Sequence, residues 1–195
     1  MVGTLTVQNL QGPASGANAN KVIIPSGHTL DASAGFVPSA GQIVQVKEWW
    51  SNAGTNITVA DTWVALDCSY ISITPKQAGS KFLYDFSTQA EMDHANGSFS
   101  SMLKLYRQVN GGGWSPVSNN ITYAPIGDNV YATQQSVTVK YTDAPSYTVG
   151  QTVEYRLYYA QITVASSTYF NQQLQGGIFA GTSQGTGGTL MEIAQ

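Results

Sequence analysis

The densest group of titratable side chains in the sequence is Glu91-Met92-Asp93-His94, with two carboxylates and one imidazole within four residues. On a turn, these groups could offer oxygen and nitrogen ligands to a divalent cation. No second cluster lies near in the sequence, and the Ala95-Asn96-Gly97-Ser98 segment that follows is typical of a turn. A solvated loop is therefore the preferred interpretation, and we expect no metal site.

The other groups that could act as nucleophiles or general bases stand apart from one another. Cys68 is the single cysteine, and its alternation with Val64 and Leu66 predicts a buried thiol rather than a catalytic one. His28 has no nucleophile near it in the sequence. Glycoside hydrolysis needs two carboxyl groups about 5 to 9.5 Å apart, and the eleven acidic residues form no candidate pair. We expect no catalytic residue, no cofactor and no enzymatic activity; a polysaccharide-cleaving enzyme is the less favoured alternative.

The aromatic residues are more informative about binding. Trp49 and Trp50 are adjacent near the end of a predicted strand, so their side chains point to opposite sides. One can join the core while the other faces solvent, another chain or a ligand. Trp114 follows the glycines 111–113 on a predicted loop tip, and Tyr123 lies in a loop-rich stretch. Exposed Trp and Tyr can stack on sugar faces, but they are also enriched at subunit contacts. Trp114, Trp50 and Tyr123 are the candidate receptor-binding residues.

Period-two alternation of apolar and polar residues predicts the elements that carry these side chains. In one predicted strand, Phe82, Tyr84 and Phe86 share a face. In another, Thr62 to Thr74, the residues Val64, Leu66, Cys68 and Tyr70 share a face. The predicted strands of the main body cover residues 42–46, 62–74, 81–88, 98–108, 135–141, 152–164 and 189–194. Seven to nine strands with Gly, Pro, Asn and Ser between them favour an antiparallel β-sandwich, with a jelly roll as the preferred form.

Composition narrows the possible partners. Only 10% of the 195 residues are charged, against about 25% in an average soluble domain, and so little charge suits a subunit packed in a larger assembly. The net charge is −3 without a basic stripe, so we expect no nucleic-acid binding. No apolar run is long enough to span a membrane. The N-terminus lacks the pattern of a secretory signal, which argues against a secreted trimeric ligand of similar plan.

The stretch KVIIPSGHTLDASAGFVPSAGQ, residues 21–42, has apolar residues but cannot form a core of its own. Three copies of such a segment can bury these residues around one axis. The alternative is an ordinary linker followed by an edge strand. We expect an attachment segment at residues 1–21, an intertwined trimeric β stem at 22–41 and a jelly-roll head at 42–195. The residues expected to form the trimer stem are Ile23, Ile24, Leu30, Phe36 and Val37.

This part of the chain resembles the leader of a family of phage tail-fibre and virion structural proteins of marine and cyanobacterial phages. The matching residues are IPSGHTLDAS at 24–33 and PSAGQIVQV at 38–46. Shorter similarities occur at 71–75, 105–107 and 190–193. The resemblance covers roughly the first 80 residues and the C-terminal tail, and it implies a trimeric virion component with a β-sandwich head.

Together, residues and resemblance predict a homotrimeric phage tail fibre or spike, located in the virion, whose head binds the host surface. The N-terminal segment would contact other tail or capsid proteins, and a host surface glycan is the candidate ligand. A capsid-decorating or tail-decorating subunit without host binding is the main alternative.

Overall fold

The computed structural model describes residues 13–16, 26, 38–59, 61–94, 101–123, 133–161, 166–171 and 185–195. The chain divides into two compact units, Met1–Val37 and Pro38–Gln195. This division lies a few residues before the boundary expected from the sequence at 39–41. The predicted stem residues Ile23, Ile24, Leu30, Phe36 and Val37 lie outside the described residues, so the trimeric stem stays a prediction.

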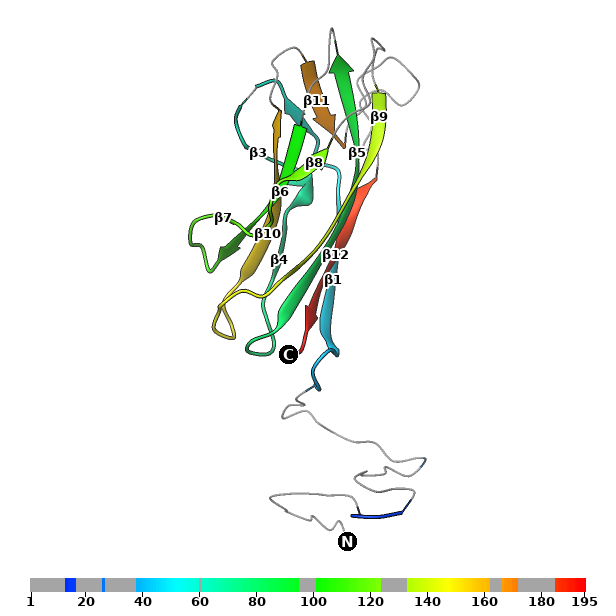
Figure 1. Ribbon diagram of the computed structural model, residues 1–195, viewed down its shortest axis with the longest axis vertical. Helices are drawn as coiled ribbons and strands as arrows, with labels where there is room; N and C mark the ends of the chain where they lie inside the picture. Colours follow the sequence, from blue (N-terminus) through cyan, green and yellow to red (C-terminus); the bar gives the residue numbers. More distant parts are fainter. Residues whose placement is uncertain are drawn as a thin grey trace. The chain divides into compact units, whose positions relative to one another are not determined.

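The unit Pro38–Gln195 consists of two antiparallel sheets, each with six described strands (Figure 1). The first sheet contains β1 (Ile43–Ser51), β2 (Thr55–Ile57), β5 (Lys81–His94), β9 (Thr133–Asp143), β11 (Ser166–Phe170) and β12 (Thr186–Ile193). The second sheet contains β3 (Val64–Ala65), β4 (Ile71–Ile73), β6 (Ser101–Val109), β7 (Ser115–Pro116), β8 (Ile121–Tyr123) and β10 (Val153–Gln161).

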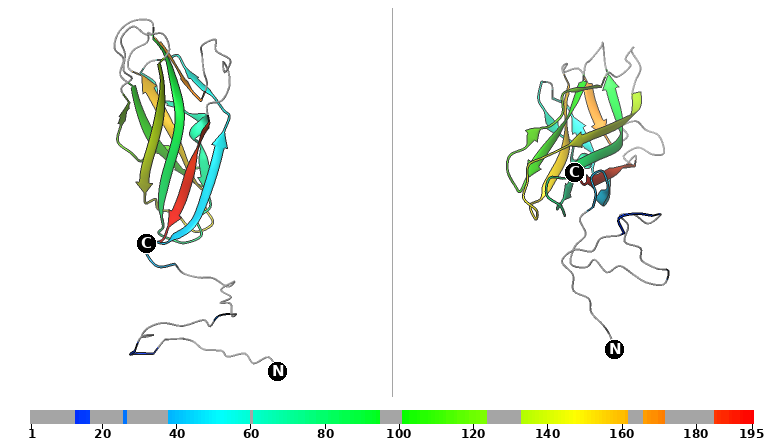
Figure 2. Two further views of the ribbon diagram at one scale, coloured as in Figure 1. Left: turned by 90° about the vertical axis from the view of Figure 1, so that its right-hand side faces the viewer. Right: turned by 60° about the horizontal axis from the view of Figure 1, so that its bottom comes forward.

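These twelve strands occupy only eight positions, because the short strands share an edge of a longer one. In the first sheet, β9 runs along one edge of β5, while β12 and β11 follow each other along the opposite edge. The principal order is therefore β1-β12-β5-β9, which Figure 2 (left) shows as four strands side by side. In the second sheet the order is β4-β10-β6-β7, with β3 and β8 extending the outer positions. This order, read with the chain sequence, is that of a jelly roll, which confirms the fold predicted for the head.

The core lies between the two sheets, where the predicted alternation is confirmed. Phe82, Tyr84 and Phe86 of β5 are fully buried and face the equally buried Tyr155 and Leu157 of β10. Tyr84 and Tyr155 are in ring contact, with centroids 6.1 Å apart. Burial of such large side chains contributes about 1.5–3 kcal/mol each, and this core is buried within a single chain.

The prediction of a single strand from Thr62 to Thr74 is wrong. The segment forms two short strands, β3 and β4, separated by a 3₁₀ turn at Asp67–Ser69. The hydroxyl of Ser69 donates to the carbonyl oxygen of Leu66 (2.6 Å) and accepts from the amide of Leu157 (2.9 Å), which fixes the turn against β10. Because the turn breaks the alternation, Tyr70 is 36% exposed instead of sharing the buried face with Leu66.

Candidate functional site

The solvent-facing side of the first sheet carries three rows of paired residues that run from β1 to β9. We call this side the outer face. Its residues alternate along β5 with the buried Phe82, Tyr84 and Phe86. The rows, taken in strand order β1, β12, β5 and β9, are Val46–Met191–Leu83–Thr142, Glu48–Thr189–Asp85–Lys140 and Trp50–Gly187–Ser87–Thr138.

The two adjacent tryptophans of β1 point to opposite faces of the first sheet, as the sequence predicted. Trp49 packs against the core, where its ring is stacked on Phe86 with centroids 6.1 Å apart. Its indole N–H donates to the carbonyl oxygen of Cys68 (3.3 Å). Gly188 leaves room for this ring, since a Cβ there would lie 2.7 Å from Trp49 Cη2. Trp50, in contrast, is 81% exposed on the outer face.

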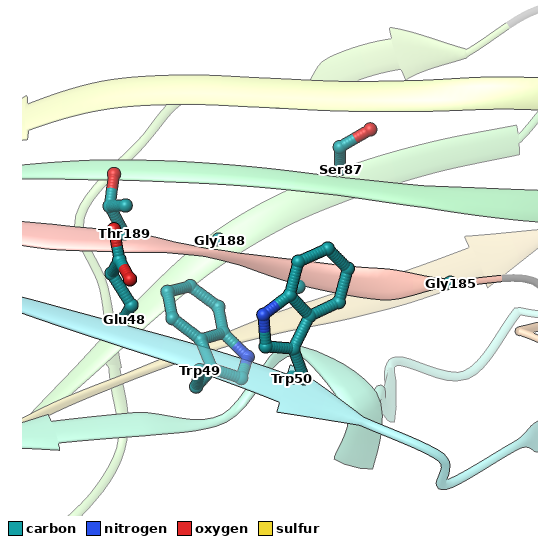
Figure 3. A pocket seen from close by; sticks show the side chains of 8 residues that line it. Glu48, Trp49, Trp50, Ser87, Gly185, Gly188 and Thr189 are labelled. Atoms are coloured by element: carbon teal, nitrogen blue, oxygen red, sulfur yellow. The ribbon is translucent and has the colours of Figure 1, made fainter.

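The indole of Trp50 lies over bare backbone. A Cβ at Gly187 would lie 3.0 Å from Trp50 Cε3 and 3.2 Å from Cδ2, so the ring rests on β12 where no side chain intervenes. Figure 3 shows the ring crossing β12 between Gly185 and Gly188. One side of the indole is thus supported by the sheet, and the remainder is open to solvent. A flat ring held in this way is a preformed stacking surface.

A hollow of about 370 Å³ adjoins this ring. Its lining residues are Glu48, Trp49, Trp50, Ser87, Gly185, Gly187, Gly188 and Thr189. They combine an aromatic surface with two hydroxyl groups and one carboxylate, on strands β1, β12 and β5 and next to β12 (Figure 3). Such a mixture of apolar surface and a few polar groups is typical of a small-molecule site.

The charges beside the hollow are unequally compensated. Asp85 forms an ion pair with Lys140, with 2.9 Å between Oδ2 and Nζ. Glu48 lies in the same row, separated from Asp85 by Thr189 of β12, and takes part in none of the ion pairs found among the described residues. The hollow therefore presents one carboxylate that forms no ion pair with any cation in the part of the chain that the structure describes.

Trp114 is not a bare loop tip. It is half-buried on the solvent side of the second sheet, where the Arg156 guanidinium lies 5.3 Å from its ring and 5.1 Å from that of Tyr70. The Tyr70 hydroxyl donates to Glu154 Oε1 (2.5 Å), and this bond raises the pKa of the phenol. Part of the Trp114 ring is thus in contact with residues of its own chain.

The remaining residues predicted from the sequence contribute little to a site. Tyr123 ends β8 and pairs with Ser101, but its side chain lies outside the description. Glu91 to His94 form the end of β5 rather than a turn, and their side chains are likewise not described. Among the described residues, no group of three or more His, Cys, Asp and Glu could hold a metal ion. Within the same residues, no helix has the length and apolar character needed to cross a membrane.

Cys68 is fully buried, as predicted. Burial raises the pKa of its thiol to about 12, so the thiol stays protonated at neutral pH and is a poor nucleophile.

Sequence reasoning found Trp50 but not its neighbours in the hollow. Glu48 could have been found, because it alternates with Trp50 along β1 and so shares its face. Gly187 also gave a signal, since a glycine inside a strand often marks a close approach of another group. Ser87 and Thr189 gave none, because only the pairing of β12 with β5 brings them beside Trp50.

Comparisons with known proteins add little to this description. No protein-family model and no curated protein matches the chain. Among solved structures, the fold is similar to a chain described as "Structure of infectious bursal disease virus Gx strain", with 12% sequence identity and a TM-score of 0.27. The match covers 88% of this chain and 47% of that one, so this chain spans about half the length of its structural neighbour.

Proposed function

We propose that the chain is a structural protein of a bacteriophage particle, a trimeric tail fibre or spike, whose head binds the host surface through the outer face around Trp50. The observation that carries the binding role is the indole of Trp50, 81% exposed and supported from below by Gly187. Leaving so large an apolar ring in water is unfavourable for the isolated head. A ligand that covers the ring would remove this cost.

The virion role is supported by the residues that resemble the phage tail-fibre leader, at 24–33 and 38–46. The low fraction of charged residues agrees with a subunit that lies in an assembly. Three copies on one stem would multiply a weak affinity per head into firm attachment. Light scattering tests this point directly: the full chain is expected at three times its mass of 20.8 kDa, and a stable monomer at micromolar concentration would contradict the trimer.

Binding is favoured over catalysis by the carboxylates of the outer face. Glu48 is the one carboxylate that lines the hollow, and the nearby Asp85 is paired with Lys140. A glycoside hydrolase needs one carboxyl group as acid and a second as base or nucleophile. A second, uncompensated carboxylate at the right distance is not provided by the described residues that line the hollow.

The experiment is adsorption of the fluorescently labelled full chain to cells of marine cyanobacteria, the host class that the sequence resemblance suggests. Wild type and Val46→Ala should bind equally, and Trp50→Ala should lose binding. Val46 is a matched control because it is 48% exposed on the same strand and the same face. No adsorption of the wild type to any strain in a broad panel would favour a decorating subunit, and release of reducing ends from surface polysaccharide would favour an enzyme; either outcome contradicts the proposal.

A further inference from the structure

We infer that the hollow beside Trp50 binds a neutral hexopyranose, stacked by its C–H face on the indole and held by hydroxyl contacts to Glu48 and Thr189. This inference deepens the proposed function and rests on it, since it names the chemical class of the host ligand.

The first step concerns the kind of surface that Trp50 offers. An indole that is supported by Gly187 on one side cannot insert into a deep apolar pocket of a partner without leaving the sheet. The indole offers a flat ring face to solvent, and a pyranose ring has a flat C–H face of similar area. Stacking of such rings on Trp combines burial of apolar surface with attraction between C–H groups and the electron-rich ring face.

The second step concerns the residues that surround the indole of Trp50. The neighbours of Trp50 in the hollow are Ser87, Thr189 and Glu48, which are hydroxyl and carboxylate groups. The exposed Val46 lies four residues from Trp50 on the same face of β1, beyond Glu48. A protein partner would require a contiguous apolar centre with the charges at its rim. Here the polar row that begins at Glu48 separates Trp50 from the apolar residues Val46, Met191 and Leu83, an arrangement that suits a ligand with hydroxyl groups around an apolar face.

The third step concerns size. The hollow measures about 370 Å³, near the lower end of the range of about 300–1,000 Å³ for small-molecule sites. This volume suits one or two sugar rings. From Trp50 the same row continues to Ser87 and Thr138. Four strands about 4.8 Å apart give this row a length of roughly 14 Å, so further sugars of a chain would pass over hydroxyl side chains.

The fourth step concerns charge and sets the specificity. The Glu48 carboxylate has no cationic partner among the described residues, and Lys140 is already paired with Asp85. A sugar with its own carboxylate would meet uncompensated negative charge and is disfavoured. A neutral sugar instead donates two adjacent hydroxyl groups to the Glu48 carboxylate, and hydrogen bonds to an ionised acceptor are the stronger kind.

The test is isothermal titration calorimetry of the full chain, which measures binding affinity. Two sets of oligosaccharides of equal length are titrated, one built from neutral hexoses and one containing uronic acids. Wild type and Val46→Ala should bind neutral members and reject uronates. Trp50→Ala should weaken binding at least about tenfold, as loss of about 1.4 kcal/mol implies. Glu48→Gln should weaken neutral binding and reduce the discrimination against uronates. Circular dichroism checks that each variant is folded; Trp50→Phe keeps an aromatic ring should Trp50→Ala prove unstable, and it should retain part of the affinity.

The outcomes separate this inference from the proposed function. If Trp50→Ala abolishes adsorption to cells but no neutral oligosaccharide binds, the host ligand is not such a sugar and the inference is overturned while the proposed function stands. Preference for uronates, or neutral binding that survives Trp50→Ala, also overturns the inference. If the chain binds neutral hexoses through Trp50 but adsorbs to no cells, the sugar site exists, but its assignment to a host ligand fails together with the proposed function.

Discussion

Glu192 is fully buried in the closing strand, and its carboxylate is the hub of a hydrogen-bond network. Gln45 Nε2 donates to its Oε2 (2.6 Å), and the backbone amides of Lys76 and Gln77 donate to the carboxylate at 2.9 and 3.0 Å. The Ser80 hydroxyl adds a fourth donor at 2.9 Å. Through these bonds, one side chain attaches the segment between β4 and β5 to β12.

We predict that Glu192→Gln lowers the free energy of unfolding by about 2–4 kcal/mol. The substitution keeps the shape, so no cavity forms, but it turns one acceptor oxygen into an NH₂ group that faces donors. At least one buried N–H then loses its acceptor, which costs about 1–3 kcal/mol. The remaining bonds also lose the added strength of an ionised acceptor.

The measurement is urea unfolding monitored by circular dichroism, with the shift of the midpoint read at unchanged slope. The matched control is Glu48→Gln, which removes the same charge from an exposed position on the neighbouring strand and should change stability by less than about 0.5 kcal/mol. If Glu192→Gln were also within 0.5 kcal/mol of wild type, the hydrogen-bond network would not be a determinant of stability and the reasoning would be refuted.

Four further predictions concern the core. Asp143→Ala removes the acceptor of Arg107 (2.6 Å) and of the Tyr155 hydroxyl (2.8 Å) and should cost about 3 kcal/mol by urea unfolding; an effect below 1 kcal/mol would contradict it. Cys68 should resist iodoacetamide in the folded protein, as mass spectrometry can show. Because burial raises its thiol pKa from 9.0 to about 12, wild type should lose about 1.4 kcal/mol per pH unit between pH 9 and about pH 12 relative to Cys68→Ala, and a constant difference would count against this. Gly188→Ala should prevent folding or lower the melting temperature sharply, since its Cβ would clash with a backbone oxygen of β5; a normal melting temperature would show that the strands can separate at this point.

The long strands of the head were predictable because one face of each is continuously buried. Phe82, Tyr84 and Phe86 alternate with Lys81, Leu83 and Asp85 in β5, and this period of two is that of a strand. The short strands β2, β7, β8 and β11 were missed, since two to five residues carry too little pattern to be recognised. They exist because neighbouring strands offer them backbone partners: β11 pairs with β5, β2 pairs with β11, and β7 and β8 pair with β6.

The break in the predicted strand from Thr62 to Thr74 depends on contacts that local sequence does not reveal. The turn at Asp67–Ser69 is held by the amide of Leu157 and by the indole of Trp49, both distant along the chain. The local alternation correctly predicted that Leu66 and Cys68 are buried. It could not predict the turn before Tyr70, because that turn depends on tertiary hydrogen bonds.

At the candidate site, too, the local sequence does not reveal the tertiary contacts that decide the structure. The sequence predicted that Trp49 and Trp50 face opposite ways, but not which of them faces inward. That choice depends on β12, where Gly188 opens space for one ring on the inner side and Gly187 supports the other on the outer side. Similarly, the loop position of Trp114 suggested exposure, whereas Arg156 lies against its ring.

The strand β12 therefore has two separable roles. Its inward side chains, Leu190 and Glu192, are buried in the head, while Gly187 and Thr189 help to form the hollow on the other side. None of the four donors to the Glu192 carboxylate lines the hollow, so changes at Glu192 and at the hollow should have additive rather than coupled effects. The folded fraction of Glu192→Gln should then bind ligand with the affinity of wild type, even though the variant unfolds in less urea. A loss of affinity in the folded variant would mean that the hydrogen-bond network at Glu192 also positions the indole ring of Trp50. Stability and ligand binding in this head could then not be varied independently.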